Sequence, residues 1–410
     1  MKYVIIGNGP ASVGAIEGIR RYDFDGAITV IGKEKFPAFS RAMVPYYLSG
    51  RVSYEKLSIR NFDYYTERGV ELCLDCSAEL VDTQKKVVFL SSGTEISYDS
   101  LLLATGNRSR QHNFANCLQD NYYDAFSLTD IENLREKISV SKRAIVLGDG
   151  VEALSIAEVL SLNGIEVIVL CQGHLLPELF DNNCSEILEK RMLGFGVTVF
   201  SDSTIKKVVK SSDDKLKGVL LGTGLFREAD FIVNAAPGKP VLISGIDEIV
   251  SYGSENKFIM SSEDASVFLS GNLINKSSSF FASSYNYGVC AGLSMASVDM
   301  DIKNVYKSPV RSINVFGINI SAGGAVEVDS PKVEKLEYID KDNCLFRKLF
   351  IKNNELNGYC IVGDRGFAGL YSGLLRSGLK FDRSSALFLL KEGVMSFFAE
   401  NNLYPDLLKS

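Results

Sequence analysis

The sequence predicts an α/β fold with two nested Rossmann-like domains and a C-terminal α+β domain. A strand, a glycine-rich turn, a helix and a second strand follow one another at the N-terminus, as KYVIIG, GNGPAS, VGAIEGIRRY and AITVIG. The same order returns near residue 144, as AIVLG, GDGVEA, LSIAEVLSLNG and EVIVL. This order is typical of parallel strands joined by a right-handed helical crossover. Past about residue 308, strands such as RSINVFGINIS and LFRKLFIK predict a mixed sheet.

Further helices are expected in the second half of the chain. DNNCSEILEKRMLGFG and SSYNYGVCAGLSMASV predict two of them, and SALFLLKEGVMSFFAENN (385–402) predicts one closing helix. A length of 410 residues is enough for two or three domains, each with its own core.

Charge and histidine content exclude several kinds of protein. The 44 basic and 50 acidic residues give a formal charge of −6, which argues against a general nucleic-acid binder. The two histidines, His112 and His174, make a histidine-based hydrolase triad or zinc site hard to assemble. We therefore expect a bound cofactor to carry any reaction, and no metal site. No apolar stretch approaches the roughly 18–20 residues of a membrane span, so we expect no membrane segment and a cytoplasmic protein.

The eight cysteines are scattered, and two of them form a C-x-x-C in VELCLDCSAEL. That segment alternates like a strand, so Cys73 and Cys76 are expected to point to opposite faces. No second pair completes a metal site. We expect unpaired cytosolic thiols here rather than a redox or metal centre.

The first glycine-rich turn is Gly7-Asn8-Gly9-Pro10-Ala11-Ser12. Gly7 permits the tight turn after the strand, and Gly9 lets the backbone approach a pyrophosphate. Ser12 is small enough for the helix to pack against the strand. The N–H groups at the start of the helix would then hold phosphates, although a plain tight turn is the alternative.

Other positions fit a dinucleotide less specifically. Glu34 follows the second strand, where an acid binds ribose hydroxyls, or it is a solvated surface charge. Arg41, in FSRAMVPYYLSG, could neutralise phosphate or form a surface ion pair. The strand LLLATG ends in Thr105 and Gly106, where a glycine again permits close approach.

Five segments are spread over about residues 1–300: GNGPAS, FSRAMVPYYLSG, SYDSLLLATG, GDGVEA and SVFLSGN. Their order and spacing resemble the FAD-dependent pyridine nucleotide–disulfide oxidoreductases, a flavoprotein family with two dinucleotide folds. SINVFGINIS and LFRKLFIKNNELNGYCIVGD resemble the C-terminal domain of the NADH:rubredoxin oxidoreductase and nitrite reductase-like branch. The resemblance implies an FAD domain at 1–108 plus 238–307, an NAD-type domain at 109–237 and a C-terminal α+β domain at 308–410.

The resemblance places the glycine turn on the FAD pyrophosphate, Glu34 on the adenosine ribose and Pro45 and Tyr46 near the isoalloxazine ring. It assigns no side chain a catalytic role. The FAD-binding residues that it implies are Gly7, Gly9, Pro10, Ala11, Ser12, Glu34, Arg41, Pro45, Tyr46, Ala78, Thr105, Gly106, Gly271 and Asn272.

Two departures from the family pattern matter for chemistry. Ala42 stands where disulfide and peroxide reductases of the branch carry a redox cysteine, so reduction through that thiol is excluded. The family's G-D, whose Asp bonds the ribityl chain, is here Gly271-Asn272. Asn keeps an acceptor but loses a charge-assisted hydrogen bond, about 1–2 kcal/mol.

The second glycine turn is degenerate. Gly148, Gly150 and Val151 fit a pyrophosphate, but Cys171 and Gln172 stand where an acid should follow the next strand. Asp149 adds a negative charge beside the phosphates. The residues favour an NADH site with Gln172 on the ribose hydroxyls, and they leave open a site that no longer binds NAD.

The predicted function is therefore transfer of electrons between NADH and a protein acceptor through FAD. The acceptor would be rubredoxin, ferredoxin or a partner iron–sulfur subunit, and a homodimer is open. The alternatives are an NADH oxidase and an FAD-bound non-catalytic subunit. Basic residues could dock an acidic carrier or form a solvated face: Arg108, Arg110, Lys206, Lys207 and Lys210.

Overall fold

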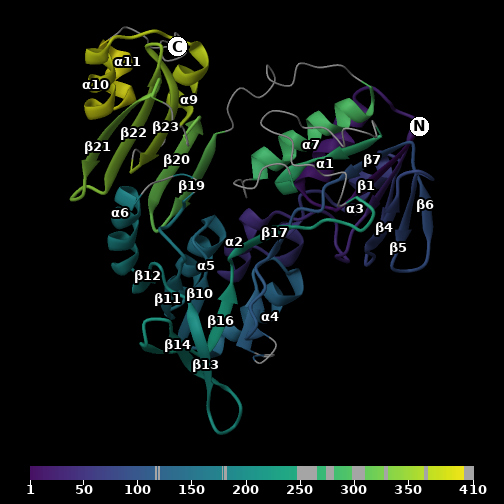
Figure 1. Cartoon of the computed structure of the whole chain (residues 1–410), viewed down its shortest axis with the longest axis horizontal. Helices are drawn as coiled ribbons and strands as arrows, with labels where there is room; N and C mark the ends of the chain where they lie inside the picture. The colour runs from purple at the N-terminus through teal and green to yellow at the C-terminus, as the bar shows by residue number, and fades with distance from the viewer. Residues whose placement is uncertain are drawn as a thin grey trace. The chain divides into compact units, whose positions relative to one another are not determined.

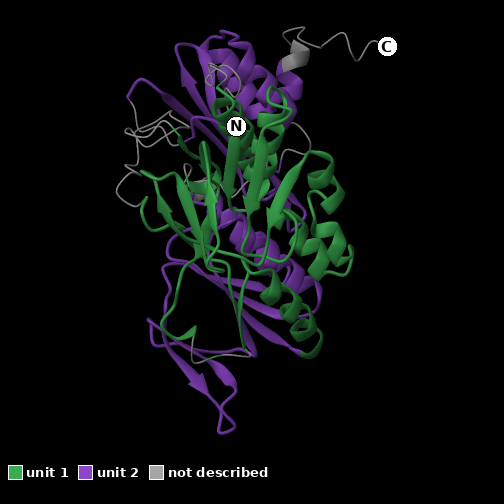
Figure 2. Ribbon diagram, turned by 90° about the vertical axis from the view of Figure 1, so that its right-hand side faces the viewer, with its two compact units in different colours: residues 1–140, 233–306 green, residues 141–232, 307–410 purple. Residues whose placement is uncertain are grey.

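The computed structural model of the chain describes residues 1–115, 118, 121–177, 179, 182–246, 266–273, 281–297, 310–326, 331–363 and 368–400 (Figure 1). The chain forms two compact units (Figure 2). Unit 1 comprises Met1–Val140 and Val233–Tyr306, and unit 2 comprises Ser141–Ile232 and Lys307–Ser410.

Unit 1 is built around a strand–turn–helix pattern. Its strands are β1 (Lys2–Ile6), β2 (Ala27–Ile31), β3 (Val70–Cys73), β4 (Ala78–Asp82), β5 (Val87–Leu90), β6 (Glu95–Ser97), β7 (Ser100–Leu103), β8 (Asn107–Ser109), β9 (Tyr122–Asp124), β17 (Pro237–Pro240) and β18 (Val267–Leu269). Its helices are α1 (Pro10–Arg20), α2 (Val44–Leu48), α3 (Phe62–Glu67), α4 (Leu128–Val140) and α7 (Phe281–Met295), with 3-10 turns η1 (Arg41–Met43), η2 (Tyr54–Leu57) and η5 (Gly271–Leu273).

The central sheet of unit 1 is parallel, in the order β18-β7-β1-β2-β3. Side chains of α1, α3 and α7 form a core with one face of this sheet. Side chains of the antiparallel sheet β4-β5-β6 form a core with the other face. Because both faces are covered, the strands are continuous apolar runs, as predicted for a Rossmann-like domain.

Helices α1 and α7 lie side by side and approach each other backbone to backbone (Figure 1). A Cβ added at Gly288 would lie 1.9 Å from the carbonyl oxygen of Ala11, and one at Gly292 would lie 2.2 Å from that of Ala15. On the α1 side, a Cβ added at Gly14 would lie 2.1 Å from a backbone oxygen of α7. Each helix therefore contributes small residues to a contact that admits no larger side chain.

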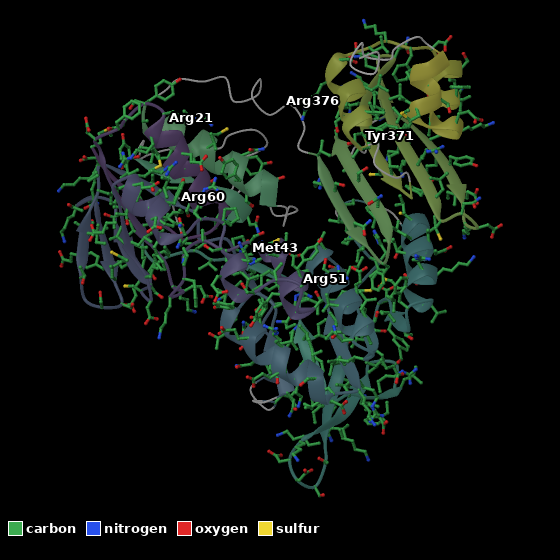
Figure 3. The ribbon with its side chains drawn as sticks, turned by 180° about the vertical axis from the view of Figure 1, so that it is seen from behind. Arg21, Met43, Arg51, Arg60, Tyr371 and Arg376 are labelled. Atoms are coloured by element: carbon green, nitrogen blue, oxygen red, sulfur yellow. The ribbon has the colours of Figure 1, made fainter. Side chains whose placement is uncertain are left out.

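Glu17 on α1 joins three helical segments. Its Oε1 accepts hydrogen bonds from Arg60 Nη2 at 3.1 Å and from the Tyr64 hydroxyl of α3 at 3.2 Å. Its Oε2 accepts one from the Tyr285 hydroxyl of α7. The half-buried carboxylate thus links α1, α3 and α7; Arg60 is labelled in Figure 3.

Unit 2 begins with the second Rossmann-like pattern. Its first elements are β10 (Arg143–Leu147), α5 (Val151–Leu162), β11 (Glu166–Leu170), α6 (Asn182–Leu193), β12 (Val197–Phe200), β13 (Ile205–Lys210), β14 (Leu216–Leu221), β15 (Phe226–Glu228) and β16 (Phe231–Asn234). Strands β10, β11 and β12 pair in parallel, and β16 lies beside β10. Strands β13, β14 and β15 form a small antiparallel sheet. The predicted pair of Rossmann-like folds is confirmed.

The C-terminal part of unit 2 is an α+β layer, as predicted. Its elements are β19 (Arg311–Val315), β20 (Ile318–Gly324), β21 (Glu334–Asp340), β22 (Leu345–Lys352), β23 (Glu355–Val362), α9 (Ala368–Ser377), α10 (Arg383–Glu392) and α11 (Val394–Glu400). The sheet, in the order β19-β20-β23-β22-β21, is antiparallel at every pairing, so the expectation of a mixed sheet is wrong. Helices α9, α10 and α11 cover one face. There the ring of Tyr371 of α9, labelled in Figure 3, lies 5.2 Å from the ring of Tyr359.

The closing helix predicted over 385–402 is interrupted at Gly393, which has a φ of +86°. Arg347, on the distant strand β22, is buried and donates to the carbonyl oxygens of Leu390 at 3.0 Å and Lys391 at 2.5 Å. A Cβ at residue 393 would lie 2.8 Å from the guanidinium. The arginine therefore satisfies the end of α10, and a new helix starts at Val394. Residues 401–402 lie outside the described chain.

The predicted strand RSINVFGINIS is instead the hairpin β19–β20, with Phe316 and Gly317 as its two turn residues. Their φ angles of +52° and +70° are those of a type I′ turn, which is unfavourable for phenylalanine. The Phe316 N–H donates to Glu158 of α5 at 2.6 Å, and its carbonyl accepts from Arg191 of α6 at 2.9 Å. Its ring packs 5.4 Å from that of Phe195. These contacts hold the strained residue in place.

Cys73 and Cys76 both pack against the apolar core between the two sheets of unit 1, so the expectation of opposite faces is wrong. The cause is one extra residue just after β3, which ends at Cys73. Gly32 N–H donates to Cys73 O at 2.9 Å and Gly32 O accepts from Cys76 N–H at 3.1 Å, with Asp75 between them at a φ of +56°. A bulge of this kind shifts the alternation of side chains by one position.

Gly288→Ala is expected to lower the free energy of unfolding of unit 1 by about 2–3 kcal/mol, because the added methyl overlaps the Ala11 carbonyl. Gly373→Ala is the matched control, since its Cβ would meet no atom within 4 Å on α9. The control should be neutral or stabilising by up to about 1 kcal/mol. Urea unfolding measures both, and equal effects would contradict the close helix contact.

Glu17→Gln is expected to destabilise the protein at neutral pH and less so in acid. Burial raises the pKa of Glu17, but hydrogen bonds from Tyr285 and Arg60 hold it below its ordinary value. The stabilisation is therefore present above the unfolded pKa, about 4.3, and is lost as the pH falls through the lower folded value. Urea unfolding at a series of pH values checks this, and a difference between wild type and variant that did not change with pH would refute it.

Candidate functional site

The first glycine turn has the shape of a phosphate cradle. Gly7 has a φ of +109°, and a Cβ there would lie 2.2 Å from the carbonyl oxygen of Ala104, so only glycine fits. Gly9 immediately precedes α1, and a Cβ there would meet no atom within 4 Å. No side chain caps this end of α1. Free space and helix N–H groups at one point are what a pyrophosphate requires.

Hydrogen bonds hold this turn in place. The fully buried Ser12 hydroxyl donates to the carbonyl of Gly7. Asn8 Oδ1 accepts from the Tyr65 hydroxyl at 3.1 Å, and Asn8 Nδ2 donates to the Phe36 carbonyl at 3.3 Å. Asn8 therefore ties the turn both to α3 and to the loop that follows β2. A local sequence signal pointed to Ser12, and none pointed to Tyr65.

The loop after β2 carries Glu34, which is half-buried. Its carbonyl accepts from the Asp75 N–H at 3.3 Å. Because β2 lies next to β1 in the parallel sheet, this loop begins at the same edge as Gly7. Ala78 begins β4 in the neighbouring sheet, where it pairs with Leu90 and is partly buried.

The segment 41–51 packs on α4 and on Phe126, which lies just before that helix. The Arg41 guanidinium lies 4.6 Å over the ring of Phe126, and that of Arg135 lies 4.8 Å over the ring of Tyr47. Tyr47 is buried beneath its arginine, whereas Tyr46 is 46% exposed. Figure 3 labels Met43 and Arg51, which flank α2 on this segment.

Ala42 and Pro45 complete that segment. Ala42 is exposed, and Pro45, at the start of α2, is partly exposed. The position predicted to lack a redox thiol is thus a methyl group that faces solvent in this structure. Phe126 and Arg135, which hold the segment, had no recognisable signal in the sequence.

The end of β7 is tied to the chain that returns after β17. The Thr105 hydroxyl donates to the Val241 carbonyl at 2.6 Å, and the Val241 N–H donates to the Gly106 carbonyl at 3.0 Å. Gly106 has a φ of +66°, and a Cβ there would meet no atom within 4 Å. A second glycine with free space in front of its Cα therefore lies beside the first glycine turn.

The end of β18 brings polar groups to the same edge. Asn272 Oδ1 accepts from the Ser284 hydroxyl of α7 at 3.1 Å, and a Cβ on Gly271 would lie 3.2 Å from that of Ala11. The hydroxyls of Ser270 and Ser283 are buried and have no hydrogen-bond partner among the described residues. Unsatisfied buried hydroxyls beside a phosphate cradle fit a polar ligand that completes them.

Unit 1 thus gathers most of its predicted residues at the carboxyl ends of β18, β7, β1 and β2. This is the edge at which parallel α/β sheets bind nucleotides. The residues present fit an extended dinucleotide such as FAD. Arg41, Pro45 and Tyr46 lie on the separate segment held by α4.

The second glycine turn, in unit 2, has the same backbone design. Gly148 has a φ of +131°, and Gly150 immediately precedes α5. A Cβ on Gly150 would meet only Glu152 Oε2, at 3.6 Å. The carboxylate of Glu152 adds a second negative charge to that of Asp149. The backbone carbonyl of Asp149 accepts a hydrogen bond from the Leu176 N–H at 2.7 Å.

After β11 the side chains differ from an ordinary nucleotide site. Gln172 is exposed, while Cys171 is buried, and burial raises the pKa of its thiol to about 11. Val151 begins α5 and is partly exposed. The cradle fits a pyrophosphate, but its surroundings are more acidic than those of the first turn.

The remaining candidates form no further site. His112 stacks 5.1 Å from Phe114, and burial lowers its pKa. Lys210 pairs with Asp214 at 3.0 Å. Within the described ranges no group of three or more potential metal ligands occurs. Likewise, of the helices that the structure describes, none combines the length and the apolar content that crossing a membrane requires.

Two parallel α/β sheets, each with an open glycine turn before a helix, define a protein with two dinucleotide-binding folds. The chain belongs to the pyridine nucleotide-disulphide oxidoreductase family, whose model matches residues 1–241. The model of the rubredoxin NAD+ reductase C-terminal domain matches residues 309–379. The resemblance inferred from the sequence is confirmed.

Individual relatives are similar over nearly the whole chain. Subunit epsilon of NADH-dependent phenylglyoxylate dehydrogenase from Aromatoleum evansii is 24% identical and covers 91% of each chain. NADH-rubredoxin oxidoreductase from Clostridium acetobutylicum is 22% identical over 94% of this chain and 97% of its own. The fold is similar to that of a covalent putidaredoxin reductase–putidaredoxin complex, with a TM-score of 0.79, 18% identity and coverage of 96% and 99%.

Family membership makes the protein an NAD(P)H-dependent flavoprotein oxidoreductase. The family uses FAD and a pyridine nucleotide, as expected from the sequence. The two cradles described above are the parts of this chain that fit these two groups.

Gly9→Leu is expected to lower FAD affinity at least 100-fold while leaving the fold intact. The new side chain occupies the open space where the pyrophosphate would lie, and it meets no protein atom at its Cβ. Gly369→Leu is the matched control, because it too points into open space, on α9. Flavin absorbance after reconstitution and circular dichroism check binding and folding. Equal FAD affinity in the two variants would rule out the first turn as the site.

Proposed function

We propose that this protein carries electrons from NADH, through FAD bound at the first glycine turn, to an iron–sulfur protein. The observation that carries the proposal is the pair of open glycine cradles combined with Ala42. Ala42 is exposed on the segment where related disulfide reductases hold a thiol, and it cannot accept electrons. Electrons that reach the flavin must therefore leave to an acceptor outside the chain.

The FAD site is proposed from its geometry. The pyrophosphate would lie on the first turn, the ribose near Glu34, adenine near the backbone of Ala78 and the ribityl chain near Asn272. Arg41, Pro45 and Tyr46 would face the phosphates or the flavin ring. The remaining proposed contacts are Gly7, Gly9, Pro10, Ala11, Ser12, Thr105, Gly106 and Gly271. Bound FAD supplies a carrier that takes two electrons and returns them singly.

The protein's own contribution would be positioning and charge. Helix α1 directs its N–H groups at the phosphates, and Arg41, held over Phe126, adds a positive charge. Ser284 holds the Asn272 amide by its oxygen, which leaves the amide N–H groups for a ligand. The family's carboxylate can only accept hydrogen bonds at that position, so this chain presents donors instead.

NADH is proposed to bind at Gly148, Gly150 and Val151, with Gln172 on the ribose hydroxyls. The open space at Gly150 supports this site. The acidic Asp149 and Glu152 favour weak binding, because both repel a pyrophosphate. A subunit that holds FAD but no longer uses NADH is the alternative that these two charges support.

The acceptor class is proposed from relatives. A rubredoxin fits the name of one relative, and a partner subunit of a larger enzyme fits the name of the other. We propose a rubredoxin, a ferredoxin or an iron–sulfur subunit of a larger complex as the acceptor. We further propose a division into an FAD domain (1–108 plus 238–307), an NAD-type domain (109–237) and a C-terminal domain (308–410), and assembly as a homodimer. A cytoplasmic location is supported by free cysteines, since thiols persist in reducing compartments.

Anaerobic titration of the FAD-loaded protein with NADH is expected to bleach the flavin absorbance. Gly150→Leu should abolish this bleaching, because its side chain fills the second cradle, while dithionite still reduces the flavin. Wild-type flavin that stays oxidised at millimolar NADH, yet responds to dithionite, would refute the proposal and favour the non-catalytic subunit.

The acceptor is tested with the same reduced protein. Mixed with oxidised rubredoxin or ferredoxin in a stopped-flow instrument, the reduced flavin is expected to reoxidise faster than with air-saturated buffer. Reoxidation that is faster with air and unaffected by either carrier would instead identify an NADH oxidase.

A further inference from the structure

The C-x-x-C of the sequence has no part in the proposed electron path, yet the bulge at Asp75 gives it a geometry of its own. Cys73 and Cys76 flank one partner residue, Gly32, through two backbone hydrogen bonds. Residues that flank one partner in a parallel ladder are about 6.6 Å apart. Cα atoms joined by a disulfide lie within about 4.4–6.8 Å. Both hydrogen bonds to Gly32 persist despite the extra residue, so the shared partner keeps the two backbones close to the spacing that a disulfide needs.

Both side chains also point to the same side of the strand. Each packs against the apolar core between the parallel sheet and β4-β5-β6, and each is partly exposed. The neighbouring Leu72, one position before Cys73, packs on the opposite face. An uninterrupted strand would have separated the two sulfurs across the sheet.

The surroundings distinguish the two thiols. Cys76 Sγ lies 3.7 Å from the Ser91 hydroxyl and 3.8 Å from that of Ser92, in the exposed turn after β5. Burial, together with the nearby Glu71 and Cys76, raises the pKa of the Cys73 thiol. Cys76 is therefore the better placed to react first, and Cys73 to react second.

We propose that Cys73 and Cys76 form a reversible intrachain disulfide with low-molecular-weight disulfides as oxidant. The Cys76 thiolate attacks one sulfur of the small disulfide, whose S–S bond breaks and releases one small thiolate. The Cys73 thiolate then attacks Cys76 Sγ and releases the second. The cysteine pair loses two electrons and two protons, and the two small thiols take up both.

The site is independent of the flavin reaction, since neither residue belongs to the proposed electron path. Its backbone is hydrogen-bonded to the loop after β2, which follows the same edge of the sheet as the first cradle. Asp75, inside the C-x-x-C, donates its N–H to the Glu34 carbonyl, and Gly32 is bonded on both sides by the cysteines. A disulfide would thus fix the bulge that holds the loop after β2.

The test uses the full-length protein with FAD bound, incubated with mixtures of oxidised and reduced glutathione, then alkylated and digested with trypsin. The peptide 69–85 contains both cysteines. In oxidising mixtures it is expected to resist alkylation and to be lighter by two hydrogen atoms, and reductant should reverse this. The half-exposed Cys344 provides the control variant Cys344→Ser, which should leave the result unchanged.

Cys73→Ser and Cys76→Ser remove one partner each. Cys73→Ser should instead accumulate a mixed disulfide with glutathione at Cys76, because the resolving thiol is missing. A wild-type peptide that alkylates fully in every mixture, or that keeps glutathione without closing the ring, would overturn the proposal. The wild-type measurement decides even if a variant does not fold.

Discussion

The contact between α1 and α7 is the constraint on which unit 1 depends. Glycines on one helix face backbone oxygens of the other at distances that exclude a single added methyl group. This proximity fixes the start of α1 beside the ends of β1, β7 and β18. It also delivers Ser284 to Asn272 and Tyr285 to Glu17. The position of the first glycine turn, the orientation of the Asn272 amide and the links made by Glu17 therefore all depend on one pair of helices whose backbones meet directly.

Structural features that depend on residues close together in the chain were predicted well from the sequence. Strand, glycine turn and helix follow from alternation and from the spacing of Gly7 and Gly9, and both Rossmann-like folds were placed correctly. Features decided by distant residues were missed. The break at Gly393 depends on Arg347, about 45 positions earlier. The side on which Cys76 lies depends on a bulge against Gly32, which no periodicity reveals.

The candidate site likewise contains residues that the local sequence predicts and residues that it does not. Glycines and the small Ser12 carry a local signal because steric demands on the turn act within a few residues. Tyr65, Phe126 and Ser284 carry none, since each reaches the site from another element. The second glycine turn has the backbone geometry of an ordinary nucleotide site. Only its acidic side chains and the exposed Gln172 distinguish it from such a site.

The hairpin turn at Phe316 joins the C-terminal sheet to the second nucleotide fold within unit 2. Glu158 of α5 and Arg191 of α6 bind the N–H and the carbonyl of this one residue. Lys341, which pairs with Glu186 of α6, and the thiol of Cys360, which donates to the Leu179 carbonyl, add further links between the C-terminal sheet and the second nucleotide fold. The first hairpin of the C-terminal sheet is therefore bonded directly to α5, the helix whose N-terminus follows the glycine turn at Gly150.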